Sequence, residues 1–316
     1  RSQSAPLLTS SLSPTLLGSI PSPSFNTFDI GPLSFTLYGL MIGLGIIAAT
    51  IITRPRAVER GLHPDTPVEI LVWIIPAGIV GARIYHVLTD WVPIGDWVKI
   101  WEGGLGIPGG VLAGVAGALL FVRHRNLSRN KVFDVLIVGV PLAQAIGRWG
   151  NWWNQELYGR ATGVAWAVEI DVPQTFDADG RVLTTGIETY HPTFLYESLW
   201  NLTLVGFLIW IDRRRILKPG RLIWVYAAGY AIGRLWIEAL RIDQATEILG
   251  VRVNLWTMGI TLMVSLVVLS RSFGGDGTPS STVDGDGDDD GDDNAEEQAG
   301  SDSSKRAVLG TSGEDE

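Results

Sequence analysis

Seven apolar stretches alternate with polar connections along most of the chain. Each is close to the roughly 20 residues that an α-helix needs to cross about 30 Å of hydrocarbon. The pattern therefore predicts an all-α integral membrane protein with seven transmembrane helices. The stretches cover approximately residues 33–53, 68–89, 105–122, 132–150, 193–211, 221–240 and 254–271.

Lys and Arg residues are distributed unevenly between the two sets of connections. The connections after the first, third and fifth stretches hold twelve of them, whereas the alternate connections hold five. An excess of basic residues in short loops is typical of the cytoplasmic side of a membrane. We therefore expect the N-terminus outside and the C-terminus in the cytoplasm, in agreement with an odd number of spans.

The segments that flank and interrupt the apolar pattern differ from it in composition. Residues 1–30 are rich in Ser, Pro and Leu and contain no sustained apolar run, so we expect a flexible extracytoplasmic arm. The long connection at about 151–192 mixes short β-like runs with turn residues and predicts a small extracytoplasmic cap between spans four and five. Residues 274–316 are low-complexity Gly, Asp and Ser and predict a disordered acidic cytoplasmic tail. The membrane domain would then occupy residues 31–273.

Composition agrees with a membrane protein and narrows its chemistry. The 316 residues are 46% hydrophobic, and the formal charge of −9 comes from the tail, because the rest of the chain carries a net charge of +3. This balance gives no reason to expect a nucleic-acid partner. The chain has no Cys, which excludes disulfides, thiolate metal sites and a cysteine nucleophile. A thiol that takes part in a reaction must therefore come from a partner.

Several polar residues are expected at one depth in the membrane. Arg83 and Arg234 lie about fifteen and thirteen residues from the expected cytoplasmic starts of their stretches, or roughly 20 Å along a helix. Arg148 ends the fourth stretch on the same side, and Tyr38 lies in the first outer turn of the first stretch. Ionisable groups in such positions are costly and indicate function. A shared cavity that opens toward the outer leaflet explains their common level.

The sixth stretch places several polar residues on one helical face. Arg234, Glu238 and Arg241 follow one another at spacings of four and three residues, so they are neighbours on a helix surface. Glu238 can therefore hold Arg234 or Arg241 by a charge-assisted bond and fix a guanidinium for a ligand. A purely structural Arg–Glu pair that ties spans together is the alternative. Arginine suits phosphate because its planar fork binds two oxygens and stays charged.

Residues 147–160, with the sequence GRWGNWWNQELYGR, resemble the signature of the prolipoprotein diacylglyceryl transferase family. The resemblance covers roughly residues 30 to 270. It includes YGLM at 38–41, GARI at 81–84, WEGG at 101–104, HP at 191–192 with YE at 196–197, and GR at 233–234 with Glu238 and Arg241.

The resemblance implies a multi-pass enzyme of the bacterial cytoplasmic (inner) membrane with its active site facing the outer leaflet. Such an enzyme transfers diacylglyceryl from phosphatidylglycerol to the lipobox cysteine in the signal peptide of lipoprotein precursors and releases glycerol phosphate. This is the first step of bacterial lipoprotein maturation. The expected partners are these two substrates and membrane lipid, with no metal and no cofactor.

Arg148 and Arg234 are the first choices for binding the phosphate and stabilising its added charge, and the family's residues at these positions are taken as essential. For the residues of the signature, a role in capping the helix or fixing the loop is equally open. Tyr38 is either a head-group ligand or an ordinary interfacial tyrosine. The candidates for substrate binding are Tyr38, Arg83, Asn151, Asn154, Glu156, Gly159, Glu238 and Arg241.

The position where the family pattern places a candidate general base is occupied by a different residue in this chain. Better-studied members carry a histidine in the glycine-rich entry to the third span, where this chain has Pro108. His191 matches another family histidine on the outer side and is the remaining catalytic candidate. Because Pro192 follows it, a plain helix-start role is an equal alternative. A reaction that needs no dedicated protein base is a third alternative.

A polytopic anion transporter or channel is the rival from another functional class, since it could use the same arginines as a binding site. Transporters often place that site near the membrane midplane and are built from repeated, broken segments. This chain is expected to hold its arginines near the outer surface, and it has no visible internal repeat. These two features favour the transferase.

Overall fold

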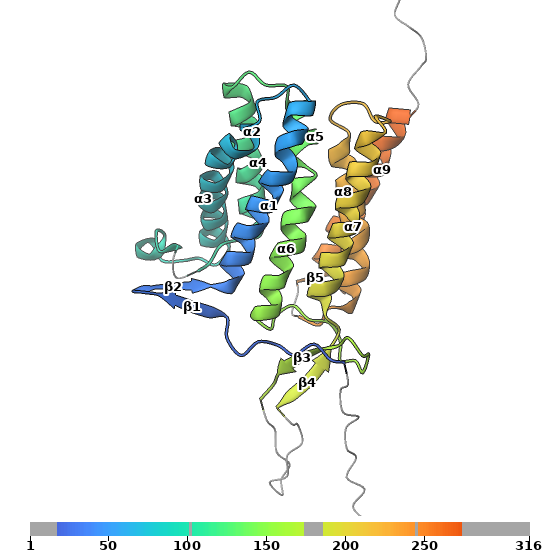
Figure 1. Ribbon diagram of the computed structural model, residues 1–316. Helices are drawn as coiled ribbons and strands as arrows, with labels where there is room; N and C mark the ends of the chain where they lie inside the picture. The colour runs from blue at the N-terminus through green and yellow to red at the C-terminus, as the bar shows by residue number, and fades with distance from the viewer. Residues whose placement is uncertain (1–17, 101–102, 174–185, 244–245, 274–316) are drawn as a thin grey trace, which may run out of the picture. The chain divides into compact units, whose positions relative to one another are not determined.

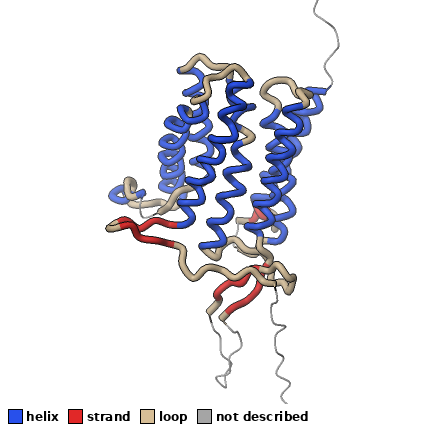
Figure 2. The backbone as a smooth tube through the Cα atoms, viewed as in Figure 1, coloured by secondary structure: helices blue, strands red, loops and turns tan. Residues whose placement is uncertain are grey.

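The computed structural model describes residues 18–100, 103–173, 186–243 and 246–273. Within these ranges seven long helices lie side by side (Figures 1 and 2), so the expected number of helices is confirmed. They are α1 (Leu37–Glu59), α3 (Leu71–Thr89), α4 (Ile107–His124), α6 (Gly139–Trp153), α7 (Thr193–Arg213), α8 (Leu222–Leu240) and α9 (Val253–Phe273). The short helices α2 (Thr66–Glu69) and α5 (Arg129–Leu136) lead into α3 and α6.

Six helical segments of the described chain are long and apolar enough to cross a membrane. Two of them join a short helix to a long one, namely Thr66–Thr89 and Arg129–Trp153. Helix α8, with 19 residues, is not one of these six segments and carries Arg234 and Glu238 among its apolar residues.

The first apolar stretch begins as a hairpin and not as a helix, which corrects the expectation for residues 33–36. Strand β1 (Thr27–Ile30) pairs antiparallel with β2 (Leu33–Thr36). Gly31 makes the turn with a φ of +60°, a conformation that glycine adopts without strain. The Thr36 hydroxyl accepts a hydrogen bond of 3.0 Å from the backbone N–H of Gly39 and caps α1.

Two more hairpins modify the expected all-α fold. Strands β3 (Val168–Asp171) and β4 (Ile187–Tyr190) pair in the expected cap, and β5 (Glu247–Ile248) pairs with β6 (Val251–Arg252). Figure 1 places all three hairpins at one end of the helices, called the hairpin end below. The last strand of each hairpin leads into α1, α7 or α9.

The described part of the arm, residues 18–30, contacts the cap and the end of α6. Ile20 pairs in parallel with Val168 at the edge of β3, and Trp152 donates to the carbonyl of Pro21 at 3.2 Å. Residues 1–17 and the acidic tail at 274–316 lie outside the described residues.

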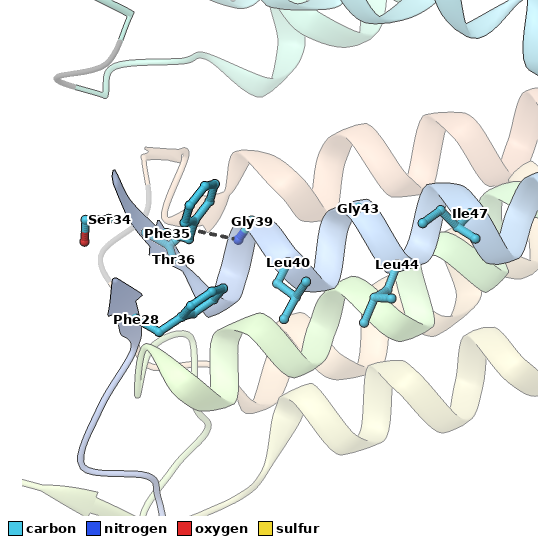
Figure 3. Close-up of a pocket in the computed structure, with 9 residues that line it drawn as sticks. All are labelled: Phe28, Ser34, Phe35, Thr36, Gly39, Leu40, Gly43, Leu44 and Ile47. Atoms are coloured by element: carbon cyan, nitrogen blue, oxygen red, sulfur yellow. Dashed lines mark hydrogen bonds between the residues drawn. The ribbon is translucent and has the colours of Figure 1, made fainter. Parts of the chain in front are cut away.

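Glycine contacts set the spacing between α3 and α4. A Cβ atom at Gly81 would lie 2.5 Å from the carbonyl oxygen of Gly109, and a Cβ at Gly109 would lie 2.3 Å from that of Gly81. Only glycine permits this approach. Gly43 differs, because a Cβ there would meet nothing within 4 Å. It lines an apolar groove of about 530 Å³ between the β1–β2 hairpin and α1 (Figure 3).

The end of the helices opposite the hairpins is held by buried ion pairs. Arg56 on α1 contacts Asp212 on α7, with 2.6 Å between Nη2 and Oδ2. Arg60 pairs with Asp212 as well and reaches Asp134 on α5 at 3.4 Å. Asp134 also accepts the backbone N–H of Gly220 at 2.7 Å. These contacts join α1, α5, α7 and the entry to α8.

Candidate active site

A buried carboxylate on α7 organises the site near the hairpin end. Glu197 stands in the second turn of α7, and its side chain is 4% exposed. Its Oε2 lies 2.6 Å from Nε of Arg148 on α6, and its Oε1 accepts a hydrogen bond of 2.9 Å from Nη1 of Arg234 on α8. The Glu197 carboxylate thus brings together the two arginines expected to be catalytic, and the three residues come from three different helices.

A second buried carboxylate extends the cluster along α8. The side chain of Glu238 is fully buried, and its Oε2 lies 2.7 Å from Nη2 of Arg234. Its Oε1 accepts a hydrogen bond of 3.1 Å from Asn254 and lies 3.0 Å from Nε of Arg252. Of the two partners that the sequence allowed for Glu238, the structure selects Arg234. Arg241 instead pairs with Asp243.

The pair at the end of α8 lies outside the membrane-spanning helices. Nε of Arg241 donates to Oδ1 of Asp243 at 2.6 Å, and Arg252 contacts the other oxygen at 3.1 Å. Burial opposes ionisation of Asp243, but its hydrogen bonds and charge interactions with the two arginines hold its pKa below the usual range. Asp243 therefore remains an anion and keeps both arginines in place.

The residues after Arg148 form a hydrogen-bonded turn that closes α6. Asn151 accepts from Nη1 of Arg148 at 3.3 Å and donates to Glu156 at 2.8 Å. Asn154 donates to the same oxygen of Glu156 at 3.2 Å. Gln155 between them has a φ of +51°, a left-handed conformation that the turn requires. Glu156 therefore acts on Arg148 through Asn151 and not by direct contact.

Gly159 joins the cap to two other candidate residues. Its N–H donates to the carbonyl of His191 at 2.9 Å, and it forms a β-bridge with Arg241. A Cβ atom at Gly159 would lie 2.8 Å from Cβ of His191, so the close approach requires glycine. Gly159 thus allows the backbone of the cap to approach His191 closely.

His191 is oriented by an aromatic pair. Its Nδ1 lies 3.0 Å from the hydroxyl of Tyr196, which accepts a hydrogen bond of 3.0 Å from Nε1 of Trp166. Because the indole N–H can only donate, the hydroxyl proton is available for Nδ1 of His191. This arrangement leaves the proton of a neutral imidazole on Nε2.

Tyr38 lies against the helix that carries Arg148. A Cβ atom at Gly150 would be 2.5 Å from the Tyr38 ring and 3.0 Å from its Cα, so Gly150 allows α1 to pack tightly on α6. Tyr38 therefore lies against the residue that comes two positions after Arg148.

Arg83 is separate from this cluster in its contacts. It is buried on α3, and its guanidinium donates to four backbone carbonyls between α3 and α4, at 2.5 to 3.2 Å. The acceptors belong to Asp96, Trp97, Gly103 and Gly104. Arg83 thus fixes this loop, and Pro108 lies in the first turn of α4, which follows it.

Sequence reasoning did not select three residues that complete the cluster, namely Glu197, Arg252 and Asn254. Glu197 had a detectable signal, because it is a carboxylate inside an apolar stretch at the level of the arginines. Arg252 and Asn254 come at the end of a connection and the start of α9, where polar residues are ordinary. No signal in the sequence distinguishes them.

The cluster can bind an anion. Arg148, Arg234, Arg241 and Arg252 carry four positive charges, and Glu197, Glu238 and Asp243 carry three negative ones, which leaves one positive charge. Among the described residues, Nη2 of Arg148 and Nε of Arg234 have no hydrogen-bond partner. These donors suit the oxygens of a phosphate.

Comparison with known proteins gives the same family as the sequence motifs. The family model for prolipoprotein diacylglyceryl transferase matches residues 26–271. The phosphatidylglycerol–prolipoprotein diacylglyceryl transferase of Frankia alni is 47% identical over 274 residues, which cover 84% of this chain and 71% of that protein. The corresponding enzyme 1 of Streptomyces coelicolor is 45% identical, with coverages of 81% and 74%. That of Corynebacterium efficiens is 40% identical over 313 residues, with coverages of 94% and 96%. The chain therefore belongs to the prolipoprotein diacylglyceryl transferase family.

Proposed function

We propose that this protein transfers a diacylglyceryl group from phosphatidylglycerol to the cysteine thiol of lipoprotein precursors. The names of the relatives supply both substrates. The observation that carries the proposal is the group formed by Arg148, Glu197 and Arg234. Two arginines from different helices share one buried carboxylate, at 2.6 and 2.9 Å, and each retains an N–H donor for a ligand.

The proposed chemistry is a substitution at carbon. The thiolate sulfur attacks the glyceryl carbon that carries the phosphate, so that a C–S bond forms while the C–O bond breaks. The bonding electrons leave with glycerol phosphate, which carries one more negative charge than the diester. Arg148 and Arg234 bind the phosphate oxygens and stabilise this charge. Because the chain has no Cys, the thiol comes from the precursor.

The proton of the thiol does not require a dedicated base. Positive surroundings lower the pKa of a cysteine from its ordinary value of about 8.5, so the thiolate forms near the arginines and its proton passes to water. The contact with Tyr196 favours an N–H at Nε2 of His191. We therefore assign His191 the role of a donor to a substrate oxygen and not of a base.

We place the hairpin end at the outer face of the membrane. The connections at the opposite end contain twelve Lys and Arg residues, against five in the connections of the hairpin end, and basic loops favour the cytoplasm. This orientation puts the N-terminus and the cap outside and the C-terminus inside. The arginine cluster would then face the outer leaflet of the bacterial cytoplasmic membrane.

The proposal is tested by transfer of labelled diacylglyceryl from phosphatidylglycerol to a lipobox peptide in detergent. We expect Arg148→Ala and Arg234→Ala each to lower kcat/KM by about 100-fold or more, because each removes a donor to developing charge. His191→Ala should cost less than about tenfold, below the effect of losing a true acid–base group. Arg125→Met is the matched control, since Arg125 forms an exposed ion pair with Glu69 at the opposite end.

Two outcomes would contradict the proposal. Arginine variants that fold and keep full activity would remove the assigned roles of Arg148 and Arg234. A wild-type protein that is folded but transfers nothing to several lipobox peptides would remove the transferase function in this chain. Anion uptake into liposomes would then be the next measurement, because the same cluster could serve a transporter.

A further inference from the structure

The guanidinium of Arg252 is directed wholly toward the protein. Its Nη1 donates to the carbonyls of Glu238 and Arg241, at 3.3 and 3.1 Å. Its Nη2 donates to the carbonyl and to the carboxylate of Asp243, at 3.0 and 3.1 Å. Its Nε lies 3.0 Å from Oε1 of Glu238. Four N–H groups of the arginine thus donate to protein oxygens, and the fifth, on Nε, is buried in the ion pair with Glu238 without a hydrogen bond of its own. None of these donors is directed toward a substrate.

These contacts place Arg252 across the C-terminal end of α8. The last carbonyls of a helix lack partners within the helix, and a cation near them is favourable. Arg252 donates to the carbonyl of Arg241 and, together with the Arg241 backbone N–H, to that of Glu238. At the same time it reaches the carboxylate of Glu238. It reaches this position because the β5–β6 hairpin returns the chain from α8 to the start of α9.

The two oxygens of Glu238 have different partners. Oε1 faces Arg252 and Asn254, whereas Oε2 faces Arg234 at 2.7 Å. Arg234 also contacts Glu197. Without Arg252, the described part of the cluster would hold three arginines, at 148, 234 and 241, against its three carboxylates. The cluster would then have no net charge, and a phosphate would enter it without electrostatic gain.

We infer that Arg252 is a positioning residue for the transferase: it neutralises one oxygen of Glu238 and thereby leaves Arg234 able to bind the phosphate. This inference rests on the proposed function. The positive charge of Arg252 gives the cluster its excess over the three carboxylates, although Arg252 itself is directed away from the substrate. The excess matters most when the leaving phosphate gains its second negative charge.

A double-mutant cycle between Arg252 and Glu238 tests this role, with kcat and KM for phosphatidylglycerol as readouts. Arg252→Met should lower kcat/KM by about 10- to 100-fold, a range typical of groups that orient site residues. Arg252→Lys keeps the charge and should recover most of the loss. In a Glu238→Gln background, Arg252→Met should cost less than about threefold, because the charge that it neutralises is absent. Arg125→Met again controls for loss of an arginine elsewhere.

Equal losses in both backgrounds would overturn the inference, because they would mean that Arg252 acts independently of Glu238. No loss in the wild-type background would overturn it too. If Arg252→Met does not fold, Asn254→Leu replaces it, since Asn254 donates to the same oxygen of Glu238. Asn254→Leu should then lower kcat/KM several-fold when residue 238 is Glu, and it should have no effect when residue 238 is Gln. An inactive wild-type protein would instead contradict the proposed function.

Discussion

Replacing Glu197 with Gln should separate the alignment of the arginines from their charge. The substitution preserves shape but removes the negative charge that Arg148 and Arg234 share at 2.6 and 2.9 Å. Because the carboxylate is 4% exposed, water cannot replace it. Breaking a buried ion pair by removing one partner typically costs about 3–5 kcal/mol of stability, so the thermal midpoint should fall clearly.

The kinetic effect should differ for the two parameters. The net charge of the cluster rises by one unit on Glu197→Gln, so binding of the anionic lipid is not weakened and KM should not rise. The two guanidiniums lose their common anchor, and kcat should fall by about 100-fold, which corresponds to about 2.7 kcal/mol in the transition state. Transfer of labelled diacylglyceryl in phosphatidylglycerol vesicles gives both parameters.

The matched control is Glu69→Gln, which breaks an ion pair with Arg125 whose side chains are 37% and 49% exposed. Exposed pairs contribute about 0–1 kcal/mol, so this variant should stay close to wild type in stability and rate. A raised KM with unchanged kcat for Glu197→Gln would refute the alignment argument. A stability loss no larger than that of the control would refute the assignment of Glu197 as a buried anchor.

Two further predictions concern packing and the cap. Gly150→Ala should destabilise the protein by about 1–3 kcal/mol, because the added Cβ would lie 2.5 Å from the ring of Tyr38. The control is Gly43→Ala, whose Cβ enters open space and should not destabilise the protein. Equal thermal midpoints for the two variants would contradict this prediction. The hydrogen bond to Glu188 raises the pKa of Tyr190 to about 12. This hydrogen bond stabilises the folded protein fully below about pH 10, the ordinary pKa of tyrosine. The stabilisation is lost as the pH rises through the raised pKa of Tyr190. Glu188→Gln should return the Tyr190 titration, followed by tyrosinate absorbance, toward the ordinary value, and an unchanged titration would show that the bond is absent in solution.

The sequence predicted the helices well because their lengths follow from apolar runs. The fifth stretch was expected to begin at residue 193, and α7 begins there. The first stretch was misjudged at its start, since residues 33–36 are as apolar as a helix but pair as a strand. Thr36 was the available signal, because a threonine before an apolar run is a common helix cap.

The site was predicted only in part because depth along a helix does not determine direction. Arg83 and Arg234 were expected at one level, yet Arg83 binds loop carbonyls while Arg234 joins two carboxylates. Partner choice depends on the conformation of connecting segments, which apolar periodicity does not describe. Arg252 illustrates this point, because the hairpin before α9 brings it to Glu238.

The ion pairs opposite the hairpins have a consequence for how a lipid could enter. Arg56 and Asp212 clamp α1 to α7 at that end, and Arg60 adds a link to Asp134. Separating these helices there would expose paired charges that are now buried, at a cost of several kcal/mol. The two helices can therefore separate more easily at the hairpin end. Lipid and product would then enter and leave the membrane domain laterally at that end, where the arginine cluster lies.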